Sequence, residues 1–250
     1  MLEKLKGNKK VVMLTAYDYQ VARLVEQAGV DLILVGDSLG MVVLGYETTK
    51  KVSMDEMLHH TRAVARGAKN TPIIGDMPIG SYATPEIALE NARKFIEAGA
   101  DGVKVEGCVK DVIEKLVSDG IPVMGHLGLL PQTAERYSVV GKGEEGERIF
   151  RDSLAVDRLG VFSLVLECVP EQLAKRITEN VKSITIGIGA GKYCDGQVLV
   201  INDLLGMDDS FKPKHVKRYA NLAETIRNAV VAFKRDVEGG KFPDEAHSFH

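Results

Sequence analysis

Five short apolar runs in this chain each end in an acidic, basic or metal-ligating side chain, and these ends recur about every 20 to 40 residues. The runs are Leu32 to Val35 before Gly36-Asp37-Ser38, Pro72 to Ile74 before Gly75-Asp76, the alternating Val103-Lys104-Val105-Glu106, Pro122 to Met124 before Gly125-His126, and Leu164 to Leu166 before Glu167. The carboxyl ends of successive buried strands open onto one face of a (β/α) barrel, so polar groups there line one site. The pattern therefore predicts an enzyme.

The composition indicates one large α/β domain. A chain of 250 residues, 45% of them hydrophobic, can build the core of an α/β barrel as a single unit. The net charge of −3 and the mixing of acidic with basic residues leave no basic face, so we expect no nucleic-acid partner.

The same features predict a cytoplasmic location. No stretch reaches about 20 consecutive apolar residues, and residues 1–6 lack the apolar region of a signal peptide, so we expect no membrane partner. Cys108, Cys168 and Cys194 are odd in number and lack C-x-x-C spacing, which favours a reducing compartment over a disulfide framework or a thiolate zinc site.

Strand and helix patterns alternate along the chain and give eight strand candidates. They are residues 11–16, 32–35, 72–74, 103–106, 122–127, 163–168, 184–188 and 198–201. Helix starts are marked by a capping box at Ser53-Met54-Asp55-Glu56 and by an N-cap with a first-turn proline at Thr84-Pro85-Glu86. We predict a (β/α)8 TIM barrel that forms a single domain over residues 1–250, with a last helix at 219–237 and a short polar C-terminal tail. The main alternative is a doubly wound open sheet, and the eight strands favour closure.

A short internal repeat supports the barrel. Ala28-Gly29-Val30-Asp31 resembles Ala98-Gly99-Ala100-Asp101, and each copy ends a helix pattern and opens a strand pattern. Two strand-helix units separate the copies, as a repeating barrel would require.

Asp37 and Asp76 are candidate metal ligands. Each follows a glycine at the end of neighbouring strands, and each alone is equally consistent with a turn or a helix cap. Together they favour a shared ligand, because two carboxylates near one point repel each other unless a cation lies between them. Oxygen ligands of this kind suit Mg²⁺.

Four further polar residues are candidates for chemistry. If Val103 and Val105 face the helices, Lys104 and Glu106 point into the barrel, where they would form a buried ion pair or part of a site. His126, at the next strand end, is a structural histidine or a ligand. Glu167 lies in an apolar segment, where burial would raise its pKa toward a range useful for proton abstraction. Cys168 should point away from Glu167 and pack in the core.

At these residues the chain resembles the ketopantoate hydroxymethyltransferase (3-methyl-2-oxobutanoate hydroxymethyltransferase) family. The matching segments are Leu14-Thr15-Ala16-Tyr17-Asp18, Val35-Gly36-Asp37-Ser38-Leu39-Gly40, Gly75-Asp76-Met77-Pro78, Val103-Lys104-Val105-Glu106-Gly107, Met124-Gly125-His126-Leu127-Gly128-Leu129-Leu130-Pro131-Gln132, Leu166-Glu167-Cys168-Val169-Pro170 and Ile186-Gly187-Ile188-Gly189-Ala190-Gly191. The resemblance implies a (β/α)8 barrel. It also implies transfer of a one-carbon unit from 5,10-methylenetetrahydrofolate to 3-methyl-2-oxobutanoate, giving 2-dehydropantoate for pantothenate and coenzyme A biosynthesis.

The resemblance also assigns roles to residues. It implies that Asp37, Asp76 and Glu106 bind Mg²⁺, that Asp37, Ser38, Asp76 and Lys104 bind the oxo acid, that His126 contacts the substrate, and that Glu167 is the proton acceptor. No position in this set departs from the family pattern. The family further implies a homo-oligomer, commonly a decamer.

The chemistry of these side chains agrees with the implied reaction. A 2-oxo acid can chelate a metal through its carboxylate and keto oxygens, and the metal then stabilises the enolate that forms when the neighbouring carbon loses a proton. Glu167 would remove that proton, while Lys104, His126 and the Ser38 hydroxyl would hold the carboxylate and the developing oxyanion. The segment from Gly40 to Lys51 could close over the pocket or be a plain surface loop.

Two alternatives remain open. The nearer is another Mg-dependent, enolate-forming carbon-carbon lyase of the isocitrate lyase or phosphoenolpyruvate mutase type, which would not need tetrahydrofolate. The further is a binding or scaffold protein that kept the barrel. The presence of every acid, base and metal-ligand position argues against this second alternative.

Overall fold

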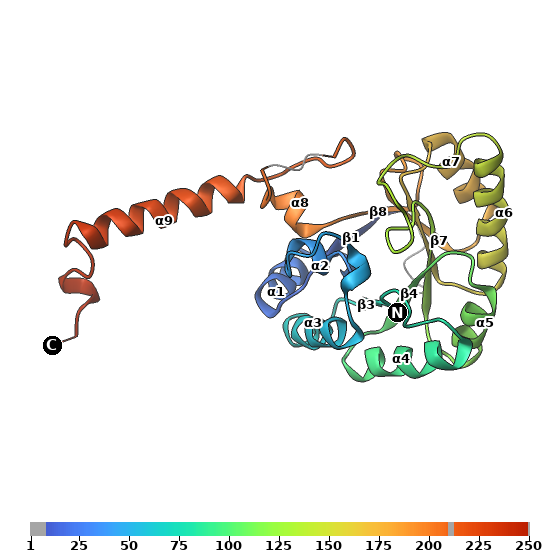
Figure 1. The fold of residues 1–250 in the computed structure, drawn as a ribbon, viewed down its shortest axis with the longest axis horizontal. Coiled ribbons are helices and arrows are strands. Elements are labelled where there is room, and N and C mark those ends of the chain that lie inside the picture. Colours follow the sequence, from blue (N-terminus) through green and yellow to red (C-terminus); the bar gives the residue numbers. More distant parts are fainter. Residues whose placement is uncertain (1–8, 210–212, 250) are drawn as a thin grey trace. The chain divides into compact units, whose positions relative to one another are not determined.

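The computed structural model describes residues 9–209 and 213–249, and its eight parallel strands close into a barrel in the order of the sequence (Figure 1). The strands are β1 (Val11–Thr15), β2 (Leu32–Val35), β3 (Ile73–Asp76), β4 (Gly102–Glu106), β5 (Val123–Gly128), β6 (Ser163–Glu167), β7 (Ile184–Ile188) and β8 (Gly196–Leu199). Closure is made where β8 pairs with β1, with Val11 opposite Gly196. The predicted (β/α)8 TIM barrel is confirmed, and the open-sheet alternative is wrong because a closed barrel has no edge strands.

Helices surround the barrel on its outer side (Figure 1). They are α1 (Tyr19–Gln27), α2 (Leu39–Val42), α3 (Met54–Gly67), α4 (Pro85–Glu97), α5 (Lys110–Ser118), α6 (Glu144–Arg158) and α7 (Glu171–Asn180), with a short 3-10 helix η2 (Thr49–Lys51). The segment interpreted as a loop from Gly40 to Lys51 therefore holds parts of α2 and all of η2. Residues 189–195 connect β7 to β8 without a helix.

The predicted helix starts are formed by the side chains that the sequence indicated. The Ser53 side chain accepts a hydrogen bond from the backbone N–H of Glu56 at 3.3 Å, and Glu56 accepts one from the N–H of Ser53 at 2.7 Å. Thr84 accepts a hydrogen bond from Ile87 at 3.3 Å, and Pro85 begins α4. These bonds satisfy N–H groups that have no partner inside a helix. The start of each helix is thus fixed by local side-chain contacts.

Alternate residues of the strands fill the barrel with an apolar core. Its buried members are Val11, Met13, Leu32, Leu34, Ile74, Met124, Val165, Ile184, Ile186 and Val198. Side chains two positions apart in a strand face the same way, so the residue two places after a core residue also points into the barrel. In β3, β5 and β6 these next residues are Asp76, His126 and Glu167. The polar groups therefore form the next layer of the core, at the carboxyl end of the strands.

The chain divides into two compact units, Met1–Val200 and Ile201–His250, and the whole barrel lies in the first. The second unit contains α8 (Ile201–Leu205), α9 (Leu222–Glu238) and a 3-10 helix η3 (Glu245–His247). Ile201, predicted as the end of the last strand, instead begins α8. A barrel domain that extends over all 250 residues stays a prediction.

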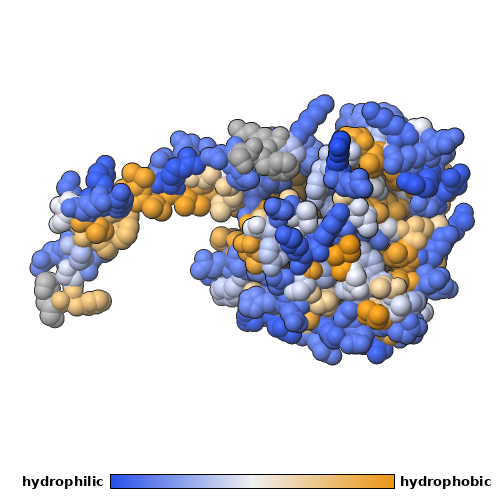
Figure 2. Space-filling view, viewed as in Figure 1, coloured by the Kyte–Doolittle hydropathy of each residue, from blue (hydrophilic) through white to orange (hydrophobic). Residues whose placement is uncertain are grey.

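Helix α9 carries apolar side chains along one side (Figure 2). Its exposed apolar residues are Ile226, Val230, Val231, Phe233 and Val237. No helix among the described residues is long and apolar enough to cross a membrane. Residues 1–6, on which the absence of a signal peptide was judged, lie outside the described residues.

The internal repeat marks two equivalent carboxylate contacts at the amino end of the barrel. Asp31, just before β2, accepts a hydrogen bond from the backbone N–H of Val12 in β1 at 2.9 Å. Asp101, just before β4, accepts one from the N–H of Ile73 in β3, also at 2.9 Å. Each aspartate satisfies an N–H at the start of the neighbouring strand and so fixes the strand register. The repeat is therefore structural and lies opposite the polar carboxyl end.

We predict that Asp101→Ala destabilises the fold without affecting ligand binding. The substitution leaves the N–H of Ile73 without its acceptor, which costs about 1–3 kcal/mol of the free energy of unfolding. Urea unfolding of the variant and of an exposed control, Glu97→Ala on α4, measures the difference. The control should change stability by less than about 0.5 kcal/mol. Equal stability of the two variants would contradict a role for Asp101 in strand register.

Candidate active site

The predicted site residues of β3 and β4 form a buried ion pair. The Nζ atom of Lys104 lies 2.6 Å from Oδ1 of Asp76, and both side chains are almost fully buried. Oδ2 of Asp76 accepts a hydrogen bond from the backbone N–H of Asp37 at 3.2 Å. Glu106 is the second acid near Lys104, with Oε1 at 3.8 Å from Nζ. The prediction that Lys104 and Glu106 both point into the barrel is confirmed.

His126 joins the two glutamates of the site. Its Nδ1 atom lies 3.3 Å from Oε1 of Glu106, and its Nε2 atom lies 3.1 Å from Oε2 of Glu167. Neither nitrogen makes a well-aligned hydrogen bond, so these contacts are ion pairs. Burial and Lys104 oppose a charge on the ring, but the two glutamates outweigh them and raise the pKa of His126 to about 9. His126 is therefore a cation between two carboxylates at neutral pH.

Asp37 has the least compensation among the buried acids. Burial and the neighbouring Asp76 raise its pKa well above the ordinary value, although Lys104 and Gln132 oppose this effect. Its Oδ2 atom accepts a hydrogen bond from the side chain of Gln132 at 3.0 Å. Among the described residues no hydrogen bond reaches Oδ1. Asp37 thus presents one carboxylate oxygen that lacks a positive or hydrogen-bonding partner.

The site carries more negative than positive charge, and this excess indicates that it can hold a cation. Lys104 and His126 face the carboxylates of Asp37, Asp76, Glu106 and Glu167. Two carboxylate charges therefore remain uncompensated in a buried region, and a divalent cation would neutralise them. No three His, Cys, Asp or Glu side chains of the described chain converge on one point closely enough to enclose a metal. The donor set and its charge fit a hard divalent ion.

Ser38 lies at the edge of this cluster. It precedes α2, but its side chain makes no cap hydrogen bond to that helix. Its hydroxyl instead contacts the hydroxyl of Tyr17 at 2.9 Å. The Ser38 hydroxyl thus uses one hydrogen bond on Tyr17 and keeps capacity for another.

Glycines next to the site residues allow the helices and strands to approach closely. A Cβ atom on Gly75 would lie 2.3 Å from the ring of Phe95 in α4, and one on Gly125 would lie 2.9 Å from Val156 in α6. The glycines before Asp76 and His126 are therefore required for packing outside the barrel, while the polar residues face inward. At Gly128, where φ is +100°, an added Cβ would lie 2.3 Å from the carbonyl oxygen of Glu167.

Cys168 does not pack in the core as expected. The strand ends at Glu167, and Cys168 takes a left-handed backbone conformation with φ of 49° and is partly exposed. This conformation costs energy for a residue with a side chain and recurs at functional sites. It turns the chain immediately after Glu167, the predicted proton acceptor. Only backbone geometry reveals this feature.

Sequence reasoning missed two polar residues that complete the site. Gln132 is fully buried and lies in the segment between β5 and α6, where Pro131-Gln132 was noted only as part of a motif. Tyr82, in the segment between β3 and α4, donates its hydroxyl hydrogen bond to the side chain of Gln132. Burial and Glu106 raise the pKa of Tyr82 above its ordinary value, so the hydroxyl stays protonated. In the sequence, Gln132 is marked only by its position: it follows Pro131, shortly after the strand that carries His126.

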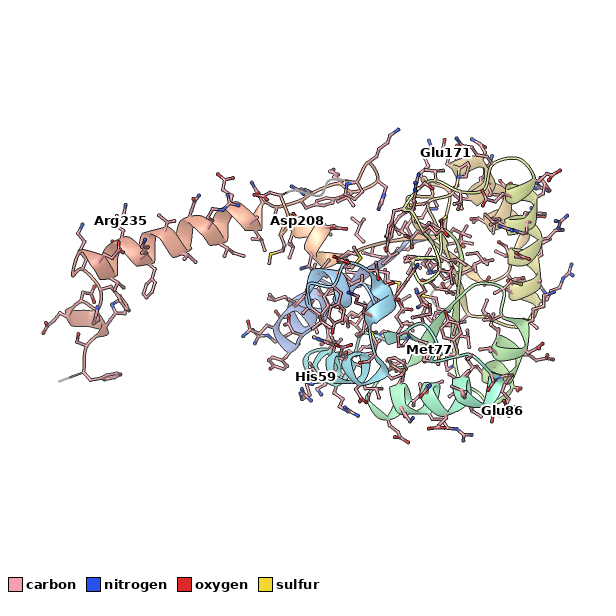
Figure 3. The ribbon with its side chains drawn as sticks, viewed as in Figure 1. His59, Met77, Glu86, Glu171, Asp208 and Arg235 are labelled. Atoms are coloured by element: carbon pink, nitrogen blue, oxygen red, sulfur yellow. The ribbon has the colours of Figure 1, made fainter. Side chains whose placement is uncertain are left out.

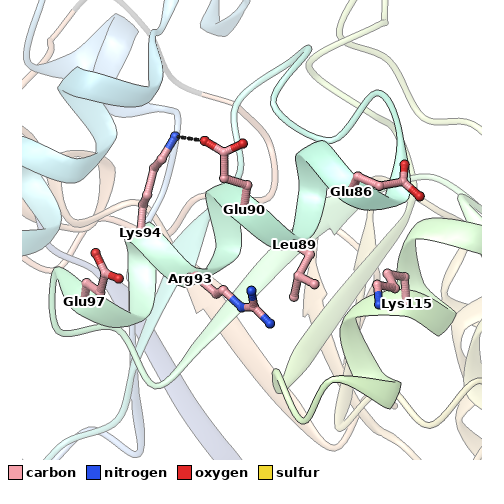
Figure 4. A pocket seen from close by; sticks show the side chains of 7 residues that line it. All are labelled: Glu86, Leu89, Glu90, Arg93, Lys94, Glu97 and Lys115. Carbon is pink, nitrogen blue, oxygen red and sulfur yellow. Dashed lines mark hydrogen bonds and ion pairs between the residues drawn. The ribbon is translucent and has the colours of Figure 1, made fainter.

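A surface groove between α4 and α5 is not the site (Figure 4). It is lined by Glu86, Leu89, Glu90, Arg93, Lys94, Glu97 and Lys115. Lys94 and Glu90 form an exposed ion pair there at 2.7 Å. Glu86 lies on this outer helix, whereas Met77, whose carbonyl accepts a hydrogen bond from Gln132, directly follows β3 (Figure 3).

A closed barrel with buried acids, a lysine and a histidine at its carboxyl end defines an enzyme of the (β/α)8 barrel class. The family model of ketopantoate hydroxymethyltransferase matches residues 1–245. A relative from Syntrophus aciditrophicus (strain SB), named 3-methyl-2-oxobutanoate hydroxymethyltransferase, is 52% identical and covers 98% of this chain and 93% of its own. The chain belongs to the ketopantoate hydroxymethyltransferase family, and the prediction of an enzyme is confirmed.

Solved structures of other enzymes share the fold. Phosphoenolpyruvate phosphomutase from Streptomyces platensis subsp. rosaceus has a TM-score of 0.64 at 15% identity and covers 98% of this chain and 89% of its own. Phosphonopyruvate hydrolase, in a complex with oxalate and Mg²⁺, has a TM-score of 0.62 at 16% identity and covers 100% of this chain and 90% of its own. At these identities the similarity shows the fold alone.

We predict that His126 makes the metal-free protein less stable at alkaline pH. Its pKa rises from the ordinary 6.5 to about 9 in the fold, so its charged contacts stabilise the protein fully below pH 6.5. This contribution is lost as the pH rises through about 9. Thermal melting in a chelating buffer should show this loss in the wild type and a smaller one in His126→Gln. Identical pH dependence in the two proteins would show that His126 is not charged in the fold.

Proposed function

We propose that this protein transfers a hydroxymethyl unit from 5,10-methylenetetrahydrofolate to 3-methyl-2-oxobutanoate and so makes 2-dehydropantoate. Membership of the ketopantoate hydroxymethyltransferase family is the observation that carries this proposal. The site supports it because it combines excess carboxylates for a cation, a buried lysine for an anionic substrate and a glutamate for proton removal. The protein would act in pantothenate and coenzyme A biosynthesis.

Asp37, Asp76 and Glu106 would hold Mg²⁺. The excess negative charge of the site and the unpartnered Oδ1 of Asp37 support this assignment, and a barrel of the same fold, phosphonopyruvate hydrolase, has been solved with Mg²⁺. When bound, the ion would supply Lewis-acid polarisation of the carboxylate and keto oxygens of the oxo acid. Carboxylate oxygens are the ligands that such hard cations prefer.

Lys104 would bind the oxo acid as a charged donor and not as a nucleophile. Burial opposes its charge, but Asp76, Glu106 and Asp37 outweigh burial and raise its pKa above the ordinary value. A protonated amine cannot form a Schiff base, so an imine route is disfavoured. The Ser38 hydroxyl and the His126 ring would complete the set of donors around the substrate, together with Asp37 and Asp76.

Glu167 would remove the proton from C3 of the oxo acid. Its side chain lies at the end of β6, remains partly exposed and contacts His126 at 3.1 Å. The charged ring of His126 would hold this carboxylate in place. The enolate carbon would then bond to the folate-borne methylene carbon, both C–N bonds to that carbon would break, and water would supply the hydroxyl oxygen of the product as tetrahydrofolate leaves.

Assembly and location complete the proposal. We expect a homo-oligomer, with the decamer of the family as the first model to test. We also expect the protein to work in the cytoplasm. The three cysteines Cys108, Cys168 and Cys194 are all free thiols, which suits a reducing compartment.

A folate-dependent assay tests the proposed function. We expect 2-dehydropantoate to form only when 5,10-methylenetetrahydrofolate, 3-methyl-2-oxobutanoate and Mg²⁺ are all present. Chelation should abolish turnover, and added Mg²⁺ should restore it, because the uncompensated carboxylates need a cation. Product formation by thoroughly metal-free protein would reject the metal site. Cleavage of an oxo acid without folate would instead favour a carbon-carbon lyase.

Glu167→Gln should slow proton removal while the substrate still binds. We expect exchange of the C3 proton of 3-methyl-2-oxobutanoate with deuterated water to fall by about 10²-fold or more, because the amide cannot accept the proton. Proton NMR measures the exchange without folate. Glu179→Gln, an exposed change on α7, is the control and should exchange at the wild-type rate. Wild-type exchange in Glu167→Gln would assign the base to another residue.

A further inference from the structure

Gln132 connects three segments of the active site that are distant in sequence. It follows β5, its side chain has no exposed surface, and it contacts groups that follow β2 and β3 and the last residue of β4. Burying an amide without hydrogen-bond partners would destabilise the fold. The partners of the Gln132 side chain therefore indicate its role. The roles assigned by the family resemblance do not include Gln132.

The side-chain amide of Gln132 has one possible orientation. Its Nε2 donates to Oδ2 of Asp37 at 3.0 Å and to the carbonyl of Met77 at 2.9 Å. Its Oε1 accepts the hydroxyl hydrogen of Tyr82. Both partners of Nε2 are acceptors, so a flipped amide would place oxygen against oxygen. Asp37 and the Met77 carbonyl therefore fix the amide so that a donor faces Asp37, and the Tyr82 hydroxyl satisfies the amide oxygen.

The backbone of the same residue fixes a second carboxylate. The N–H of Gln132 donates to Oε2 of Glu106 at 3.1 Å. Oε1 of Glu106 then faces Lys104 and His126, at 3.8 and 3.3 Å. On Asp37 the amide occupies Oδ2, and no hydrogen bond from the described residues reaches Oδ1. One residue thus binds one oxygen of each acid and so restricts the rotation of both carboxylates.

We propose that Gln132 is a positioning residue that presents Asp37 and Glu106 to a divalent cation, and that Tyr82 acts on the cation through Gln132. This inference rests on the proposed metal site. Gln132 itself does not touch the metal or the substrate in this role. Its effect is to prevent rotation of two carboxylates. Without Gln132, these carboxylates would have to become ordered when the cation binds. Groups that orient metal ligands in this way typically change metal affinity by about 10–100-fold.

Titration of Mg²⁺ into substrate-free protein, followed by calorimetry, tests the proposal. Gln132→Leu keeps much of the side-chain volume but removes the amide, and we expect the dissociation constant for Mg²⁺ to rise by about 10–100-fold. Tyr82→Phe removes only the hydroxyl that donates to the amide oxygen, and we expect a measurable rise of less than about tenfold. Ser163→Ala, which removes another buried hydrogen bond, to Ile184 at 2.8 Å, is the matched control and should bind Mg²⁺ like the wild type.

A double-mutant cycle separates positioning from general destabilisation. If Tyr82 acts through Gln132, Tyr82→Phe should have no further effect on Mg²⁺ affinity in the Gln132→Leu background. Additive losses would overturn the role of Tyr82. Wild-type affinity in Gln132→Leu would overturn the whole inference. If Gln132→Leu does not fold, Tyr82→Phe decides alone, and wild-type affinity in that variant rejects the proposal.

The wild-type protein distinguishes this inference from the proposed function. Wild-type protein that binds Mg²⁺ but makes no 2-dehydropantoate would contradict the proposed reaction and leave the role of Gln132 to the variants. Wild-type protein that makes product without binding Mg²⁺ would overturn the metal site and this inference together.

Discussion

The buried ion pair between Lys104 and Asp76 is the interaction on which the rest of the site depends. Two charges are removed from water inside the barrel, and their attraction must offset a large desolvation cost. The pair lies at 2.6 Å, and Asp76 also accepts a backbone hydrogen bond from Asp37. Among Asp76 and Glu106, Lys104 lies within hydrogen-bond distance of Asp76 alone. The others therefore need His126, a hydrogen bond or a cation.

This shortage of positive charge explains how the acids differ. Burial would raise the pKa of Glu106, but His126, Lys104 and the N–H of Gln132 outweigh burial and lower it. Asp37 has weaker partners, and its pKa is raised. The same barrel thus holds an acid whose ionised form is stabilised beside one whose ionised form lacks such partners. A cation would make both acids ligands at once.

The packing around the site shows why small and polar residues alternate at the strand ends. In β3 and β5 the inward position carries Asp76 or His126, and the outward position carries Gly75 or Gly125. The outward glycines bring Phe95 and Val156 against the strands, so the helices are seated directly behind the polar groups. Close packing limits how far the strands can move. The site is therefore held by the same contacts that build the outer layer.

Sequence alone determined the repeating units and the inward row of site residues, because strand alternation and helix caps depend on neighbours only a few residues away. Asp37, Asp76, Lys104, Glu106, His126 and Glu167 could all be named from their places at the ends of strand patterns, with family resemblance adding their roles. Tertiary structure decided which charges pair, for example Lys104 with Asp76 at 2.6 Å rather than Glu106 at 3.8 Å. It also revealed Gln132, the left-handed Cys168 and the direct connection from β7 to β8. These features depend on contacts between segments far apart in the chain, and only closure of the barrel brings such segments together.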